Sequence, residues 1–271
     1  MTKILDGSEL VGYIKERQAY QVRALRQASR IAPRLVIVKS KTASAVIDTY
    51  VRMKIRYGDD ILIETVVMSL EEADMIDAIK KLNEDVDVHG IIVQLPLDDA
   101  TNTDAILEMI APEKDVDGLG PRAKFDSATA KAINWLLAGY AIDLKDKKIA
   151  IVGNGRLVGA PLARMWKESG YDIEVLTRST EDIASILRQS NVIVTATGVP
   201  HLITSEMIAI GSVVVDAGTA SEEGRIVGDI DETLRSRDDL TITPEKGGVG
   251  PLTVAGLFDN VITAAQTTVK N

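Results

Sequence analysis

The feature that most constrains this chain is a repeated alternation of short apolar runs with longer amphipathic stretches. Residues 34–39, 61–67 and 90–95 are apolar and rich in β-branched side chains, which is typical of buried strands. Between them, residues 43–57 and 70–82 have the spacing of helices. Strands that alternate with helices predict βαβ units and a parallel sheet.

A second series of the same kind begins at Lys148. Its apolar runs, at 149–152, 173–176, 192–195 and 212–215, recur at intervals of roughly 20 residues, which leaves room for one crossover helix each. Helical spacing also marks residues 128–140 and 253–269. We therefore expect an α/β protein of two domains. The first is an N-terminal α/β domain of residues 1–138, completed by a C-terminal helix in 253–271. The second is a Rossmann-type, doubly wound domain of residues 139–252.

Composition excludes several classes of function. With 31 Lys and Arg against 40 Asp and Glu, the formal charge is −9, which argues against a nucleic-acid or anionic-membrane partner. No cysteine is present, so disulfides, Cys-ligated zinc and thiol catalysis are excluded, and the two histidines, His89 and His201, cannot build a multi-histidine metal site. No run approaches the ~18 apolar residues of a membrane helix, and the first residues lack a signal-peptide pattern. We expect a soluble, cytoplasmic protein.

The segment Ile149-Ala-Ile-Val-Gly-Asn-Gly-Arg-Leu-Val-Gly159 is a strand, a glycine turn and the start of a helix. Gly153 and Gly155 would let the backbone turn tightly and approach a pyrophosphate, and Gly159 would let the helix pack close to the sheet. The glycine spacing is one residue longer than the usual dinucleotide fingerprint. Its place inside a βαβ series nevertheless favours a dinucleotide site over a turn without a ligand.

The end of the second strand of this series bears on the choice of cofactor. NAD-binding domains favour an acidic residue there, which accepts a hydrogen bond from the ribose 2′-hydroxyl. Here the strand ends in Thr177-Arg178-Ser179-Thr180, and Glu174 comes too early for that role. Arg178 could pair with a 2′-phosphate, although it could equally be a surface arginine. The sequence favours NADP, with NAD as the alternative.

Three polar residues stand out in the first series. Tyr50 and Lys54 are spaced i and i+4, so on a helix they share one face about 5–6 Å apart at Cβ. A lysine beside a phenol in an apolar pocket can have a lowered pKa and exchange protons near neutrality, although an exposed helix face would show the same spacing. Gln94 ends an apolar run, and the carboxyl ends of parallel strands are where such sheets bind ligands.

Two further segments have open interpretations. In Lys114-Asp-Val-Asp-Gly118, the two acids at 115 and 117 could form a carboxylate pair, a metal site or a turn, and the lack of other clustered ligands disfavours a metal. The segment Lys246-Gly-Gly-Val-Gly-Pro-Leu-Thr253 could let a ligand approach its backbone before a helix begins, or could act as an interdomain hinge.

Taken together and in this order, these segments resemble the bifunctional methylenetetrahydrofolate dehydrogenase/cyclohydrolase family over nearly the whole chain. The resemblance rests on six segments, of which Val-Gln-Leu-Pro-Leu, Lys-Asp-Val-Asp-Gly and Gly-Gly-Val-Gly-Pro are the most specific. The segments lie at 50–54, 90–97, 112–118, 152–161, 228–231 and 247–253. The resemblance implies oxidation of 5,10-methylenetetrahydrofolate with NADP, followed by hydrolysis of the methenyl product to 10-formyltetrahydrofolate. It also implies that residues 1–138 form a folate-binding catalytic domain and that the protein is a homodimer.

The resemblance also implies residue roles. Lys54 would be the general acid/base, Tyr50 would orient the folate, Gln94 would hydrogen-bond Lys54, and Asp117 would bind the pterin ring. The implied substrate contacts are Tyr50, Gln94, Leu95, Pro96, Asp117, Gly248, Pro251 and Thr253. The implied cofactor contacts are Gly153, Asn154, Gly155, Arg156, Val158, Gly159, Arg178, Ser179, Thr197 and Gly198. No metal is implied.

The chain departs from the family in places. Gly153-Asn154-Gly155 replaces the usual Gly-Arg-Ser, so that Arg156 or Arg178 would have to supply the 2′-phosphate contact. Residues 127–130 read Ser-Ala-Thr-Ala where the family has Pro-Cys-Thr-Pro, and the loop before them is shorter. Glu245-Lys246 stands in place of Val-Pro.

Three other classes of protein share parts of this pattern. A short-chain dehydrogenase also uses Tyr-x-x-x-Lys, but its glycine turn precedes the tyrosine, whereas Tyr50 here comes long before Gly153. A shikimate-type dehydrogenase would lack the Val-Gln-Leu-Pro-Leu and Lys-Asp-Val-Asp-Gly segments. A non-catalytic dinucleotide sensor is disfavoured by Lys54, Gln94 and Asp117 together, but the sequence alone leaves it open.

Overall fold

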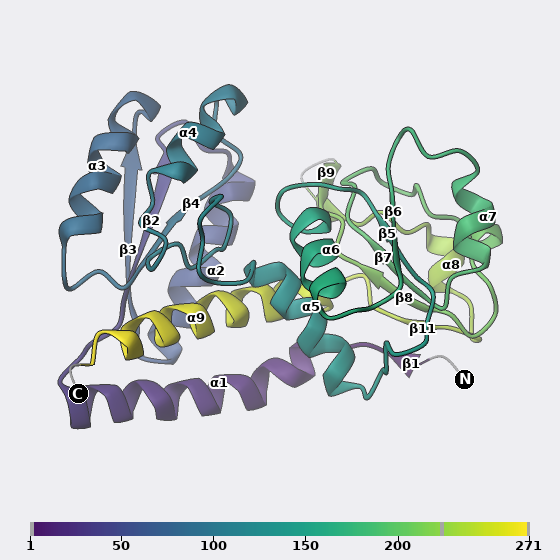
Figure 1. Cartoon of the computed structure of the whole chain (residues 1–271), viewed down its shortest axis with the longest axis horizontal. Coiled ribbons are helices and arrows are strands. Elements are labelled where there is room, and N and C mark those ends of the chain that lie inside the picture. The colour runs from purple at the N-terminus through teal and green to yellow at the C-terminus, as the bar shows by residue number, and fades with distance from the viewer. Residues whose placement is uncertain (1–2, 223–224, 270–271) are drawn as a thin grey trace. The chain divides into compact units, whose positions relative to one another are not determined.

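The computed structural model describes residues 3–222 and 225–269, and it divides into two compact units (Figure 1). The three-stranded unit comprises Gly12–Ala128 and Val254–Asn271, and the six-stranded unit comprises Met1–Val11 and Thr129–Thr253. The sequence boundaries differ from these units, because residues 3–11 and 129–138 belong to the six-stranded unit. The terminal residues 1–2 and 270–271, which the expected domains include, lie outside the described residues.

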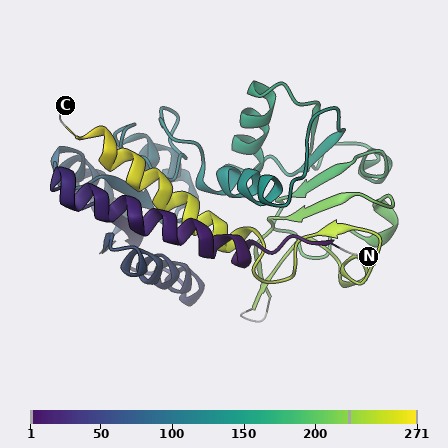
Figure 2. The ribbon, with the colours of Figure 1, turned by 90° about the horizontal axis from the view of Figure 1, so that it is seen from below.

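The three-stranded unit contains a parallel sheet in the order β3-β2-β4. Its strands are β2 (Arg34–Ser40), β3 (Glu64–Leu70) and β4 (Gly90–Val93). Its helices are α2 (Ala45–Asp60), α3 (Glu72–Glu84) and α4 (Thr103–Glu108), preceded by a 3-10 turn at Ala100–Asn102. Two long helices, α1 (Gly7–Ala24) and α9 (Val249–Thr267), lie side by side (Figure 2). Each has residues in both units, and α1 continues as a π-helical turn at Leu25–Ser29.

The core of this unit follows from strand alternation. Val36, Val38, Ile91 and Val93 face α3 and α4 and bury Met75 and Ile79 of α3, together with Ile106 and Leu107 of α4. Leu35, Ile37 and Ile92 are also fully buried, and they point to the opposite face because successive side chains of a strand alternate. The sheet is therefore buried on both faces, as its uninterrupted apolar runs predict.

The six-stranded unit has a parallel sheet in the order β1-β11-β8-β7-β5-β6. Its strands are β1 (Lys3–Ile4), β5 (Ile149–Val152), β6 (Ile173–Leu176), β7 (Val192–Thr195), β8 (Val213–Asp216) and β11 (Thr241–Ile242). An antiparallel hairpin of β9 (Ala220–Glu222) and β10 (Arg225–Val227) follows β8. The helices are α5 (Ala128–Gly139), α6 (Gly159–Glu168), α7 (Ile183–Arg188) and α8 (Glu232–Arg235), and a 3-10 turn covers Ser205–Met207.

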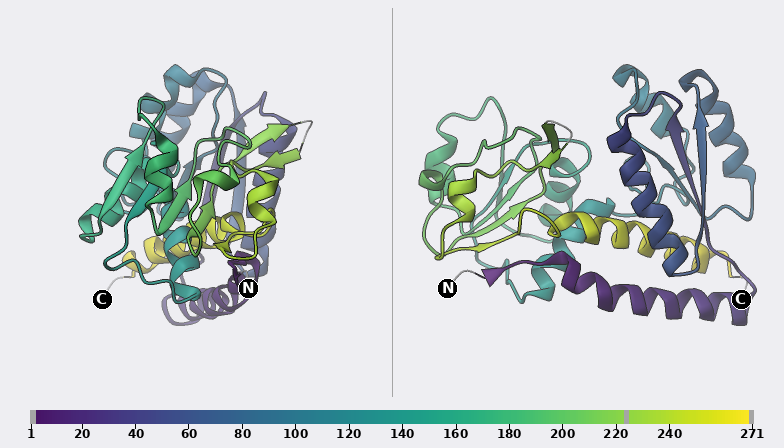
Figure 3. Two further views of the ribbon diagram at one scale, coloured as in Figure 1. Left: turned by 90° about the vertical axis from the view of Figure 1, so that its right-hand side faces the viewer. Right: turned by 180° about the vertical axis from the view of Figure 1, so that it is seen from behind.

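Helices cover both faces of this sheet, so the expected doubly wound arrangement is confirmed (Figure 3). One face packs against α7 and α8, through Leu187 and Leu234. On the other face Trp166 of α6 is fully buried, and its Nε1 donates to Asn134 Oδ1 of α5 at 2.7 Å. In the described part of the chain, no helix is both long enough and apolar enough to span a bilayer.

The expected strands at 149–152, 173–176 and 192–195 have the observed bounds, but two other expectations were wrong in position. The second strand runs from Glu64 to Leu70, because Ile61 caps α2 and Leu62 turns the chain with a φ of 65°. The last helix begins at Val249, four residues before the expected start, with Pro251 in its first turn, where proline is well tolerated.

Candidate active site

Each of the two parallel sheets has a topological switch point, where the chain changes the direction in which strands are added. In the three-stranded unit, β2 is followed by β3 on one side and by β4 on the other. Ligands of open α/β sheets bind at the carboxyl ends of the strands that flank such a point. Gln94 is the first residue after β4, and its backbone N–H donates to Val38 O of β2 at 2.8 Å. The structure therefore places Gln94 at the switch point.

Lys54 of α2 meets Gln94 across this end of the sheet. Lys54 Nζ donates to Gln94 Oε1 at 2.6 Å, and both side chains are partly buried. Gln94 Nε2 donates to the carbonyl of Leu95 at 3.1 Å, which fixes the amide so that its oxygen faces Lys54. Helix α2 begins at an N-cap, Ser44, whose hydroxyl accepts from Ile47 N at 3.4 Å.

Tyr50 and Lys54 lie one turn apart on α2, as their spacing predicts. Tyr50 is partly buried, and burial raises the pKa of its phenol. The phenol therefore remains protonated at neutral pH and can donate a hydrogen bond. Leu95 and Pro96 follow Gln94 in the same loop, with Leu95 partly buried and Pro96 exposed.

Asp117 couples electrostatically to Lys54. Burial lowers the pKa of the Lys54 ammonium, whereas the nearby charge of Asp117 acts in the opposite direction. Burial likewise raises the pKa of the Asp117 carboxyl, and the charge of Lys54 opposes that rise. The two groups are thus a weakly solvated acid–base pair, in which desolvation favours the neutral forms and mutual attraction favours the charged forms.

The residues around Asp117 have separate structural tasks. Lys114 Nζ donates to the carbonyls of Leu82, Asn83 and Asp85 at 2.9, 2.8 and 2.6 Å, and so caps the carboxyl end of α3. The buried Asp115 accepts from the N–H groups of Gly118 and Gly120 at 3.1 and 2.7 Å. Of the three interpretations of this segment, the turn is the one that describes Asp115.

Asn260 of α9 holds the same segment from the other side. This residue is fully buried, and its Nδ2 donates to the carbonyls of Val116 and Asp126 at 2.8 and 3.0 Å. The backbone on both sides of Asp117 is thereby held, at Val116 by Asn260 and at Gly118 by Asp115. No sequence motif singles out Asn260, because its partners lie more than 130 positions away in the chain. Within residues 3–222 and 225–269, no cluster of three acidic or histidine side chains could hold a metal ion.

In the six-stranded unit the switch point lies between β5 and β7. Gly153 follows β5 with a φ of 101°, and a Cβ there would lie 2.6 Å from Ala196 O, so only glycine fits the turn. A Cβ on Gly159 would lie 2.0 Å from Gly153 O, so glycine is needed for α6 to approach the strand end. A Cβ on Gly155 would meet no heavy atom of the described residues within 4 Å.

These three glycines match the three tasks of a dinucleotide-binding turn, which are a tight turn, room for a pyrophosphate and close helix packing. The open space at Gly155 is the observation that fits a cofactor, because nothing in the protein's own packing requires a glycine there. Asn154, Gly155 and Arg156 are exposed in this turn, and Val158 is the N-cap position of α6 and makes no side-chain capping bond. The helix N-terminus therefore favours an anion.

The other expected cofactor residues lie at the same edge of this sheet. Arg178 and Ser179 are exposed in the turn that follows β6, where the hydroxyls of Thr177 and Ser179 are 2.9 Å apart. Thr197 and Gly198 follow β7, and Thr197 Cγ2 would lie 3.3 Å from a Cβ on Gly153. The structure therefore brings the loops after β5 and β7 together at the switch point.

Three of the residues expected to contact substrate belong to the six-stranded unit. Gly248 is buried against Thr243, while Pro251 and Thr253 are partly buried in the first turns of α9. Thr253 Oγ1 donates to Val249 O at 3.2 Å within that helix. The remaining substrate candidates, Tyr50, Gln94, Leu95, Pro96 and Asp117, belong to the three-stranded unit.

Two family models match successive parts of the chain. Residues 5–117 match the model of the catalytic domain of tetrahydrofolate dehydrogenase/cyclohydrolase, and residues 127–269 match the model of its NAD(P)-binding domain. The Bifunctional protein FolD of Hydrogenobaculum sp. is 36% identical over 276 residues, which cover 96% of this chain and 98% of that protein.

Solved structures of the same kind of enzyme also resemble this chain. The bifunctional FolD enzyme from Campylobacter jejuni is 34% identical with a TM-score of 0.92, and the match covers 98% of this chain and 99% of that one. The Trypanosoma brucei enzyme, solved with NADP and an inhibitor, is 29% identical with a TM-score of 0.92 and covers 100% of this chain and 99% of its own. A shikimate dehydrogenase from Peptoclostridium difficile, at 14% identity and a TM-score of 0.54, shares the fold alone. The chain belongs to the tetrahydrofolate dehydrogenase/cyclohydrolase family.

Proposed function

We propose that this protein oxidises 5,10-methylenetetrahydrofolate to the 5,10-methenyl form with NADP and then hydrolyses that product to 10-formyltetrahydrofolate. The observation that carries the proposal is the bond of 2.6 Å from Lys54 to Gln94 at the switch point, with the Asp117 charge acting on Lys54. An amine of lowered pKa, held at the ligand-binding edge of a sheet, is suited to proton transfer near neutral pH.

Lys54 acts as the general base in the hydrolysis. The water oxygen bonds to the methenyl carbon, and one water proton passes to the neutral Lys54 amine. One carbon–nitrogen bond of the adduct then breaks to give the formyl group, and the remaining hydroxyl proton passes to the departing nitrogen. Because one Lys54 N–H is directed at Gln94 Oε1, the lone pair of the neutral amine is directed elsewhere and is available to the water.

Asp117 and Tyr50 bind and orient the folate. The Asp117 carboxylate can accept hydrogen bonds from the amino and amide N–H groups of a pterin ring. The backbone on both sides of it is held, because Gly118 N donates to Asp115 and Asn260 donates to Val116 O. The Tyr50 phenol, one helical turn from Lys54, orients the ring and shields the amine from bulk water. The further substrate contacts are Leu95, Pro96, Gly248, Pro251 and Thr253.

NADP fits the glycine turn of the six-stranded unit, and when bound it supplies the acceptor for the hydride. The turn and the N-terminus of α6 would hold the pyrophosphate, at Gly153, Gly155 and Gly159. Arg178 and Ser179 would hold the 2′-phosphate, since no carboxylate stands at the end of β6 to favour the 2′-hydroxyl of NAD. The remaining contacts are Asn154, Arg156, Val158, Thr197 and Gly198.

An absorbance assay tests the proposal. Purified protein is mixed with 5,10-methylenetetrahydrofolate and either NADP or NAD, and methenyl formation is followed together with its hydrolysis. Methenyl formation with NADP, followed by its decay, supports the proposal. Binding of NADP without turnover would indicate a non-catalytic dinucleotide sensor, and a preference for NAD would overturn the choice of cofactor.

The proposal includes a homodimer in the cytoplasm. The family resemblance implies pairing through the dinucleotide domain, and β6 is an edge strand of its sheet, which presents unpaired backbone groups to a second copy. Light scattering at micromolar concentration measures the oligomeric state, and a monomeric mass would contradict the dimer.

A further inference from the structure

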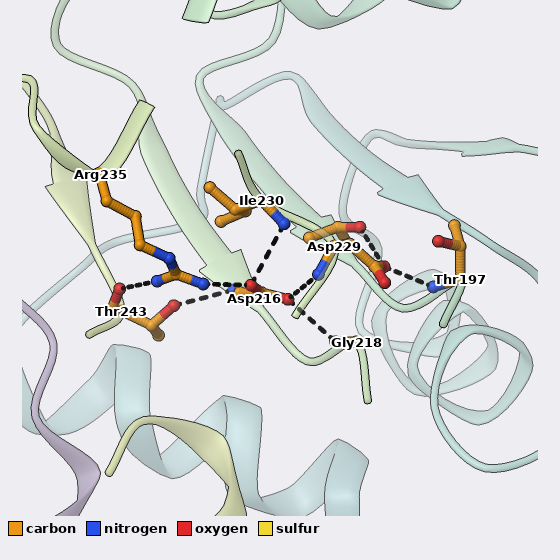
Figure 4. Close-up of polar contacts among 8 residues, drawn as sticks. Thr197, Asp216, Gly218, Asp229, Ile230, Arg235 and Thr243 are labelled. Atoms are coloured by element: carbon orange, nitrogen blue, oxygen red, sulfur yellow. Dashed lines mark hydrogen bonds and ion pairs between the residues drawn. The ribbon is translucent and has the colours of Figure 1, made fainter. Parts of the chain in front are cut away.

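Asp229, in the segment 228–231 that carries part of the family resemblance, is fully buried in the six-stranded unit. Its Oδ2 accepts from Thr195 Oγ1 at 2.5 Å and from the backbone N–H of Thr197 at 2.6 Å. Thr195 is the last residue of β7, and Thr197 lies in the loop that follows it. Figure 4 shows Asp229 directed at this loop, with Asp216 on its other side. One carboxylate oxygen thus fixes both ends of a three-residue segment.

Asp216, the last residue of β8, holds Asp229 in place. Asp216 Oδ1 accepts from the N–H groups of Asp229 and Gly218, both at 3.1 Å. Its Oδ2 accepts from Arg235 Nη2 of α8 at 2.5 Å, and Arg235 also donates to Thr243 O at 3.0 Å. The charge of Arg235 offsets that of Asp216, one of the two buried carboxylates. Asp216 and Asp229 together link α8 to the loop after β7.

Two glycines allow the pair to pack this closely. A Cβ on Gly218 would lie 2.1 Å from Asp229 Oδ1, and a Cβ on Gly228 would lie 2.0 Å from Asp216 Oδ2. The loop after β8 and the segment before α8 therefore interlock through their carboxylates. Any side chain at either glycine would push an aspartate out of position.

The loop that Asp229 holds forms one side of the switch point. Ala196, between Thr195 and Thr197, donates its N–H to Val152 O at 2.8 Å, and its carbonyl is the atom that a Cβ on Gly153 would strike at 2.6 Å. The glycine turn thus packs directly against a backbone that Asp229 fixes. A shift of the Thr195–Thr197 segment would change the shape of the site that faces the cofactor.

A contribution to stability does not by itself explain why Asp229 is buried. Its Oδ1 is buried and has no hydrogen-bond partner among the described residues. A buried carboxylate oxygen without a protein donor costs free energy, so the burial of this aspartate calls for an explanation. The other oxygen, Oδ2, provides the explanation, because a carboxylate oxygen holds its two donors more firmly than a neutral acceptor would.

We propose that Asp229 is a positioning residue for the dinucleotide, which holds the Thr195–Thr197 segment in the shape that NADP requires at the switch point. The inference rests on the proposed NADP site. Asp229 acts through the loop and is not itself a catalytic residue. Its effect is therefore confined to the cofactor half of the activity, and it leaves the Lys54 hydrolysis unchanged.

The test compares Asp229→Ala, Asp229→Asn and Thr195→Val with wild type and with the control Asp231→Asn. Asp231 is the N-cap of α8, two positions away, and asparagine caps a helix equally well. NADP binding is measured by calorimetry, and hydrolysis of methenyltetrahydrofolate is measured with no NADP present. We expect Asp229→Ala to weaken NADP binding at least tenfold while hydrolysis stays within twofold of wild type. Asp229→Asn, which keeps one acceptor oxygen, and Thr195→Val should each give smaller losses, and Asp231→Asn should give none.

Unchanged NADP binding in Asp229→Ala would overturn the inference while leaving the proposed function intact. Parallel loss of NADP binding and hydrolysis, with a lowered Tm, would show a purely structural role and would also overturn it. If Asp229→Ala fails to fold, Thr195→Val and Asp229→Asn decide the question by the same two measurements. Failure of the wild-type protein to bind NADP would refute the proposed function itself, and the inference with it.

Discussion

Replacing Gly159 with alanine tests the packing of the glycine turn. A Cβ at this position would lie 2.0 Å from Gly153 O, whereas an ordinary contact begins near 3.4 Å. Helix α6 would therefore have to move by about 1.4 Å relative to the end of β5, or the strained contact would have to be shared among its neighbours. Overpacking of this kind costs typically about 1–3 kcal/mol. We expect Gly159→Ala to lower the free energy of unfolding of the six-stranded unit by that amount.

Gly155→Ala is the matched control, because a Cβ there would meet no described heavy atom within 4 Å. Chemical denaturation followed by circular dichroism gives the free energy of unfolding of both variants, and calorimetry gives their affinity for NADP. We expect Gly155→Ala to keep wild-type stability yet lose affinity, since its methyl group would occupy the space assigned to the pyrophosphate. Equal stability of Gly159→Ala and Gly155→Ala would refute the reasoning from packing.

Three further predictions follow from single residues. Lys114→Met removes a cation that donates to three carbonyls at the end of α3, and should lower the free energy of unfolding by about 1–2 kcal/mol in urea denaturation. Arg178→Ala should raise the KM for NADP more than the KM for NAD, and equal effects would place the 2′-phosphate contact elsewhere. Burial, together with the charge of Lys114, lowers the pKa of His89, so the unfolded chain binds a proton at higher pH than the folded protein does. Stability should therefore fall as pH drops below about 6.5, and His89→Gln should reduce the difference in Tm between pH 7 and pH 5; an unchanged difference would contradict this assignment.

The sequence predicts those parts of the fold that depend on local patterns. The runs at 149–152, 173–176 and 192–195 are bounded by turn residues and match the observed strands. The run from Ile61 is fully apolar at its start, but Ile61 and Ile63 are buried outside the strand, so apolar content alone could not locate the turn at Leu62. The two-residue strands β1 and β11 depend on pairing between distant segments and leave no local pattern.

The residues of the candidate site show the same contrast between local motifs and long-range contacts. Tyr50, Lys54 and Gln94 lie in recognisable local motifs, and the structure shows that Lys54 and Gln94 meet. Asn260 and Asp229 were not predicted as site residues, because each acts on a backbone segment far from it in the sequence. A buried asparagine or aspartate is visible as a positioning residue only after the fold has placed its partners.

The most direct test of the proposed function is hydrolysis of methenyltetrahydrofolate by Lys54→Ala, measured without NADP. Lys41→Ala serves as the control, because Lys41 is an exposed lysine whose salt bridge to Glu71 spans 3.4 Å at the surface. We expect Lys54→Ala to lose hydrolysis while it keeps its Tm and its affinity for NADP, and Lys41→Ala to retain all three. Hydrolysis at the wild-type rate in Lys54→Ala would remove this lysine from the mechanism and contradict the account.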